Sequence, residues 1–209
     1  CTSIGAGMLK EGDAYMNGGT SAGVLALGPG AKKIGGQTTS SGASLSWLKN
    51  TICLDEQRIA KQTGRDVYDI IAQEIEKAPI GSHGVLFHPY LAGERAPRNN
   101  PRAKGSFTGI TLTTSRQDLM RSVVEGIGFN VNLILQGIRS QGYDIRRMPI
   151  VGGMGKSPVM RQIFADIMNV ELVTFEYMDE AATVGVAVLG GIAMGIFADE
   201  TAVHAFMKV

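Results

Sequence analysis

Residues 150–158 read Ile-Val-Gly-Gly-Met-Gly-Lys-Ser-Pro, an apolar strand that runs into three glycines and then into a Ser-Pro helix start. Glycine has no Cβ, so the main chain of such a bend can approach a ligand closely. The helix that follows directs the N–H groups of its first turn back toward the bend, where they favour an anion. The stretch therefore predicts a strand, a nucleotide-binding bend and a helix in succession. A purely structural turn is the alternative.

Two better-known phosphate-binding loops do not fit this stretch. A Walker A loop requires glycine five residues before the Gly-Lys-Ser triplet at 155–157, and that position is Ile150. A dinucleotide fingerprint that begins at Gly153 requires glycine at the position of Pro158. The bend is thus a third type of site.

The composition excludes several classes of protein. The chain has 209 residues, 44% of them hydrophobic, enough for one large domain or two small ones with a buried core. Twenty basic and nineteen acidic residues leave a net charge of +1, which argues against a nucleic-acid partner. Two cysteines, without a zinc-type Cys/His cluster, predict a reducing, cytoplasmic compartment. Four glycines interrupt the longest apolar stretch, 181–197, which predicts a tightly packed buried helix and no membrane span.

Both ends of the chain suggest a longer protein. The chain starts at Cys1 without Met, inside a predicted Gly/Ala-rich helix, and it stops at Val209 directly after a short helical stretch. No signal-peptide pattern accounts for this start. We therefore expect residues 1–209 to be a fragment.

The order of the expected elements indicates an α/β domain with a mixed sheet. Three short runs separated by Gly and Pro come first and predict an antiparallel meander. The longest helix is expected to begin at Ser115, with Asp118 as a capping-box acid, and to stop at Gly142. The expected strands are 14–18, 23–27, 32–38, 84–90, 148–151 and 171–175, and the expected helices are 2–9, 44–52, 66–75, 115–142, 158–168 and 180–196.

The hairpin tip at 18–23 reads Gly-Gly-Thr-Ser-Ala-Gly and lies between two expected strands. Hairpin tips often need glycine, so one interpretation is purely structural. The other is an anion site, in which backbone N–H groups and the hydroxyls of Thr20 and Ser21 face a phosphate chain.

Six motifs, taken together, resemble those of a known family. They are Gly-Thr-Ser at 19–21, Ser-Gly-Ala-Ser-Leu-Ser-Trp-Leu at 41–48, Pro-Tyr-Leu-Ala-Gly-Glu-Arg-Ala-Pro at 89–97, Gly-Ser-Phe-Thr-Gly-Ile at 105–110, Glu-Gly at 125–126 and Gly-Gly-Met-Gly-Lys-Ser at 152–157. In this order and spacing the chain resembles the C-terminal domain of the FGGY carbohydrate kinases. The run at 89–97 is most similar to xylulokinase-like and related ketose kinases.

The resemblance implies a ribonuclease H-like (actin-like ATPase) domain over 1–209, with a mixed five-stranded sheet flanked by helices. The domain would be the nucleotide-binding half of a kinase that uses ATP and Mg²⁺ to phosphorylate a sugar hydroxyl, such as that of xylulose. The sugar-binding N-terminal domain would be absent from this chain. Many relatives pair as dimers, so a homodimer is a further expectation. The nucleotide-binding residues that the resemblance implies are Gly19, Thr20 and Ser21 at the β- and γ-phosphates, Gly42 at the start of a helix, and Gly152, Gly153 and Ser157 around the adenosine.

The resemblance implies no catalytic residue and no metal ligand within the chain. In this family the general base is an aspartate just before the helix that opens these residues. Asp13, flanked by Gly12, is predicted to be a turn residue instead. The isolated chain is therefore predicted to be inactive. Two rival functions remain, namely another ATPase of the actin-like superfamily and a non-catalytic nucleotide-binding regulatory protein.

Other polar residues have simpler interpretations. In the loop 93–105, Glu94 and Arg95 either form a structural ion pair or border the cleft between domains, and the structural role is preferred. His83 and His88 are expected on opposite faces of a strand, which argues against a shared metal. Val186 stands where relatives usually have alanine in a Gly-Ala-Ala motif, so the last helix is expected to pack differently behind the glycine bend.

Overall fold

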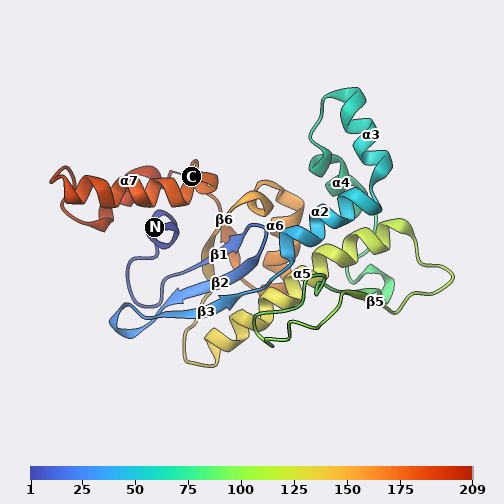
Figure 1. Ribbon diagram of the computed structural model, residues 1–209, viewed down its shortest axis with the longest axis horizontal. Coiled ribbons are helices and arrows are strands. Elements are labelled where there is room, and N and C mark those ends of the chain that lie inside the picture. Colours follow the sequence, from blue (N-terminus) through green and yellow to red (C-terminus); the bar gives the residue numbers. More distant parts are fainter. Residues whose placement is uncertain (209) are drawn as a thin grey trace.

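The computed structural model describes residues 1–208, which form a mixed five-stranded sheet flanked by helices (Figure 1). The strand order is β3-β2-β1-β6-β7. β2 pairs antiparallel with both β1 and β3, whereas β6 is parallel to β1 and to β7. The predicted meander followed by parallel strands is therefore confirmed. The strands are β1 (Ala14–Gly18), β2 (Ala22–Leu27), β3 (Lys33–Gln37), β6 (Arg147–Val151) and β7 (Glu171–Val173).

The longest helix, α5, runs beside the sheet and begins with the predicted capping box. Ser115 Oγ accepts the Asp118 N–H at 3.1 Å, and Asp118 Oδ2 accepts the Ser115 N–H at 2.8 Å. The α-helices are α1 (Thr2–Gly5), α2 (Ser41–Thr51), α3 (Leu54–Thr63), α4 (Val67–Ile75), α5 (Arg116–Arg139), α6 (Pro158–Met168) and α7 (Ala181–Ala193). Short 3₁₀ segments lie at Pro29–Ala31, Ser82–Gly84, Gly153–Lys156, Met178–Glu180 and Glu200–Phe206, and a separate hairpin pairs β4 (Leu86–His88) with β5 (Ser106–Thr108).

Side chains of the central strands alternate between two apolar layers, as the strand period requires. Met16 and Ile150 belong to the large core that the strands share with α2, α5 and α6. Their neighbours Tyr15 and Val151 face the other way, into a smaller cluster that includes Ala181 at the start of α7. The sheet therefore has an apolar core on each face.

Helix α3 and strand β5 were not predicted. Some expected elements are shorter than predicted: the first helix ends at Gly5 instead of Leu9, the longest helix ends at Arg139 instead of Gly142, and the strand expected over 84–90 covers only Leu86–His88. Glycine explains the end of the first helix, because Gly7 adopts a left-handed φ of 74°. The shorter strand places His83 in a turn and not on a strand face.

The expectation of a tightly packed, buried helix over 181–197 was also wrong. One side of α7 packs on α1 so closely that a Cβ at Gly185 would overlap the carbonyl of Cys1. The other side is open, with Val186 exposed by 56% and Met194 by 78%. Apolar composition alone does not decide burial, because another element must cover the helix. Val186 lies on this open side and does not pack behind the glycine bend.

The expected ion pair between Glu94 and Arg95 does not form. Glu94 is buried, where its carboxylate accepts hydrogen bonds from the Asn130 amide and from the backbone N–H of Arg95. The guanidinium of Arg95 instead donates to the backbone carbonyl and the side-chain oxygen of Gln37, both at 3.2 Å. The loop is thus fastened to the end of β3 through Arg95 and to α5 through Glu94.

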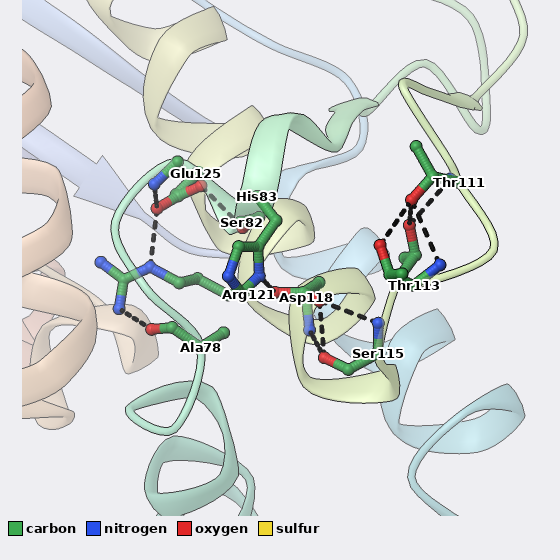
Figure 2. Close-up of polar contacts among 11 residues, drawn as sticks. Ala78, Ser82, His83, Thr111, Thr113, Ser115, Asp118, Arg121 and Glu125 are labelled. Atoms are coloured by element: carbon green, nitrogen blue, oxygen red, sulfur yellow. Dashed lines mark hydrogen bonds and ion pairs between the residues drawn. The ribbon is translucent and has the colours of Figure 1, made fainter.

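A buried carboxylate holds the turn before β4 (Figure 2). Residues 81–84 all have left-handed φ angles between 49° and 86°, including the non-glycine Ser82 and His83. Glu125 of α5 accepts hydrogen bonds from the Gly81 N–H at 3.0 Å, from Ser82 Oγ at 2.9 Å and from Arg121 Nε at 2.7 Å. One acid from the Glu-Gly motif therefore stabilises a strained turn 44 residues away.

Candidate functional site

The hairpin tip and the glycine bend lie at the same edge of the sheet. β1 and β6 are parallel neighbours, with Asn17 in register with Val151, so their carboxyl ends meet. Gly152 directly follows β6 with a φ of 92°, and a Cβ there would lie 3.0 Å from the carbonyl oxygen of Gly18. The two bends are therefore in contact, although more than 130 residues separate them in the sequence.

The first turn of α2 docks on the hairpin tip. The N–H of Gly42 donates to the carbonyl of Gly19 and the N–H of Ala43 donates to that of Thr20, each at 3.2 Å. A Cβ at Gly42 would overlap the carbonyl of Gly19, so this contact requires glycine. The two N–H groups are thus engaged within the protein and hold the tip in place.

The bends and α2 enclose one cavity of about 700 Å³, a size common for small-molecule sites. Five of the seven residues implied by the resemblance line it, namely Gly19, Thr20, Gly42, Gly153 and Ser157. Ser21 does not; its carbonyl instead accepts the side-chain amide of Asn17 at 3.2 Å. Gly152 lines a smaller cavity of about 210 Å³ on the other side of the bend.

The glycine bend leads into α6 through Ser157. Its Oγ caps α6 by accepting the Met160 N–H at 3.4 Å, and Pro158 occupies the first helical position, where a missing N–H costs nothing. Ser157 is buried and lines the cavity, so its hydroxyl proton can still be donated to a ligand. The capping geometry fixes where that donor lies.

Sequence reasoning missed the far end of the cavity. Leu45 and Ser46 of α2, Tyr68 and Asp69 at the start of α4, and Met160 of α6 line it. The helix 66–75 was predicted, but no local pattern links its first turn to glycines more than twenty residues away. Only the tertiary fold brings the two together.

Three charged residues line this cavity, namely Lys156, Asp66 and Asp69. Lys156 Nζ lies 2.6 Å from Asp179 Oδ2, and this hydrogen-bonded ion pair raises the pKa of Lys156. Asp13 is distant from the cavity lining; its Oδ2 accepts the N–H groups of Leu9 and Lys10, which confirms the predicted turn role. Within residues 1–208, no three His, Cys, Asp or Glu side chains are grouped closely enough to hold a metal.

A family model for the C-terminal domain of the FGGY carbohydrate kinases matches residues 14–194. The chain belongs to the FGGY family. It is 36% identical to a gluconokinase from Bacillus licheniformis over 163 residues, which is 78% of this chain and 32% of that protein. It is 31% identical to a xylulose kinase from Staphylococcus epidermidis over 228 aligned positions, which cover all of this chain and 44% of that protein.

Solved FGGY structures share the fold. The crystal structure of a gluconate kinase from Lactobacillus acidophilus aligns with a TM-score of 0.83 and 26% identity, over 99% of this chain and 44% of that one. The ribonuclease H-like (actin-like ATPase) fold predicted for the chain is thereby confirmed. The chain spans less than half the length of the FGGY relatives it matches. No helix within residues 1–208 is long and apolar enough to cross a bilayer.

Proposed function

We propose that this FGGY chain is the nucleotide-binding C-terminal domain of a kinase that transfers a phosphoryl group from ATP to a sugar hydroxyl. The observation that carries the proposal is the single cavity lined by the hairpin tip, the start of α2 and the glycine bend. A ketose such as xylulose is the proposed acceptor. Gluconate is a second candidate, because a gluconokinase is among the relatives.

The proposed roles follow the geometry of the cavity. The tip at Gly19 and Thr20 would border the phosphates, where backbone and hydroxyl donors suit an anion. The apolar side chains of Leu45, Tyr68 and Met160 at the far end suit a nucleobase. Phosphoryl transfer asks mainly for positioning and charge stabilisation, which a rigid cradle of this type supplies.

The donor set suits Mg²⁺ that arrives with the nucleotide. Mg²⁺ keeps several waters and binds through substrate phosphates with one or two protein oxygens, so a three-carboxylate cage is not required. Thr20, which is exposed on the hairpin tip and lines the cavity, would offer a hydroxyl oxygen there. When bound, the ion would neutralise charge on the transferred phosphoryl group.

The sugar pocket and the general base are proposed to lie outside this chain. The two carboxylates that line the cavity, Asp66 and Asp69, belong to the start of α4 and not to the hairpin tip, so we assign neither as the general base. We therefore expect the 209-residue chain to bind nucleotide without phosphorylating a sugar. A cytoplasmic location and a homodimer remain predictions.

The test is equilibrium binding of a fluorescent ATP analogue, displaced by Mg·ATP. A Cβ at Gly19 would have no heavy atom nearer than 3.5 Å, so Gly19→Val should fold normally while filling the phosphate end of the cavity. We expect it to weaken binding at least tenfold. Gly137→Ala is the matched control, because Gly137 lies on α5 with open space around it. Equal affinity of Gly19→Val and the wild type would refute the proposed site.

Turnover separates the proposal from its rivals. Mixing the chain with Mg·ATP and ketoses should give no sugar phosphate. A protein that also contains the proposed sugar-binding domain should form sugar phosphate. A regulatory protein would bind ATP and never phosphorylate sugar in its complete form. Another actin-like ATPase would hydrolyse ATP without transferring phosphate to any sugar.

A further inference from the structure

The far end of the cavity is lined by α2 and α4, two of the three helices inserted between β3 and β4, and by Met160 of α6. Along α2, the cavity runs from Gly42 to Ser46, four residues or about 6 Å. It continues to the first turn of α4, which Lys49 joins to α2 by placing its ammonium 5.4 Å from the centre of the Tyr68 ring. A nucleotide with its phosphates at the hairpin tip would therefore direct its base toward α4.

Two carboxylates lie at this end of the cavity, and only one of them accepts a hydrogen bond within the protein. Asp66 caps α4, and its Oδ1 accepts the Tyr68 N–H at 2.7 Å. The side chain of Asp69, one turn further along, is exposed and lines the cavity, and it forms no hydrogen bond or ion pair with another residue of the described part of the chain. Lys156, the cation that lines the same cavity, is held by Asp179. Asp69 thus offers an acceptor that the protein itself does not use.

An ionised carboxylate accepts hydrogen bonds and donates none, so it distinguishes bases by the group they present. Adenine presents an amino group at C6, which donates. Hypoxanthine presents a carbonyl oxygen there, whose lone pairs a carboxylate repels. We propose that Asp69 selects the base of the nucleotide by accepting a hydrogen bond from the 6-amino group of adenine. This inference rests on the proposed nucleotide site and names its specificity.

A role in the helix alone makes a different prediction. An acid in the first turn of a helix interacts favourably with its dipole, and this effect changes stability equally whichever nucleotide is present. Base selection instead changes the ratio of two affinities measured on the same protein. The ratio of ATP to ITP binding is therefore the readout that separates the two roles.

The experiment compares the dissociation constants of Mg·ATP and Mg·ITP for the 209-residue chain and for Asp69→Asn. A hydrogen bond to a charged group is worth at least about tenfold in affinity, so the wild type should prefer ATP by about that factor. The amide of Asp69→Asn can turn its NH₂ group toward a carbonyl, so the preference should fall to about twofold or less. Asp69→Ser, which also suits a first helical turn, should lose the preference in the same way.

Asp55→Asn is the control, because Asp55 occupies the first turn of the neighbouring helix α3 and does not line the cavity. It should keep the wild-type ratio. An unchanged ratio in both Asp69 variants, or no ATP preference in the wild type, overturns the role of Asp69 while leaving the nucleotide site intact. Failure of the wild type to bind either nucleotide removes the site and this inference together.

Discussion

Replacing Glu125 with alanine tests how the buried carboxylate of Figure 2 stabilises the fold. The side chains of Glu125 and Arg121 are exposed by only 5% and 11%, and their charged atoms lie 2.7 Å apart. Glu125→Ala leaves the Arg121 guanidinium buried without its counter-charge, and it removes the acceptor for Gly81 and Ser82. Breaking such a pair costs about 3–5 kcal/mol of unfolding free energy. For a domain of this size that is a fall of about 10 °C in Tm.

Thermal and urea denaturation followed by circular dichroism measure this loss. Asp144→Ala is the control, because its ion pair with Arg146 is largely exposed and should be worth less than about 0.5 kcal/mol. The double variant Glu125→Leu with Arg121→Met should recover part of the stability, since no unpaired charge remains. A loss below about 1 kcal/mol for Glu125→Ala would show that the carboxylate does not hold the turn, contrary to this reasoning.

Two further stability effects follow from the structure. Burial raises the pKa of Asp118, but hydrogen bonds from Ser115 and His83 lower it below the ordinary value overall. Asp118→Asn should therefore lower the free energy of unfolding by about 1 kcal/mol at pH 7. This difference from the wild type should shrink as pH falls below about 4, where the carboxyl of the unfolded state protonates. A constant difference from pH 7 to pH 3 in urea titrations would contradict the assignment. Gly126→Ala should destabilise by about 1–3 kcal/mol because its Cβ would overlap the Phe87 carbonyl, whereas Gly137→Ala on the open side of the same helix should stabilise by about 0.5–1 kcal/mol. Equal Tm values for these two variants would rule out the close contact at Gly126.

Elements whose signals lie within a few neighbouring residues were predictable from the sequence. The capping box fixes the start of α5 within a single turn, through Ser115 and Asp118. The hairpin from β1 to β2 has two strands that are buried along most of their length and joined by a short glycine tip, and its register follows from that loop. The glycine bend before α6 was predictable for the same reason, because strand, glycines, cap and proline are contiguous.

Elements fixed by distant partners were not predictable. The buried residue of α3 is Glu56, which forms an ion pair with Arg116 at 2.7 Å, 60 residues away, while Leu54 and Ile59 are exposed. No apolar period marks such a helix. The same limit applies to the cavity, since Tyr68 and Asp69 join it only through the packing of α4 against α3 and α5. The prediction that α7 is buried was wrong because an apolar sequence does not show which side of a helix another element covers.

The central claim is that the hairpin tip, the start of α2 and the glycine bend bind one nucleotide. Amide chemical-shift mapping tests it most directly, by titrating the isotope-labelled chain with Mg·ATP. We expect saturable shifts at Gly19, Thr20, Gly42 and Gly153 with one common dissociation constant. Saturable shifts confined to another surface, such as the groove beside Arg139 and Asp166, would contradict the claim.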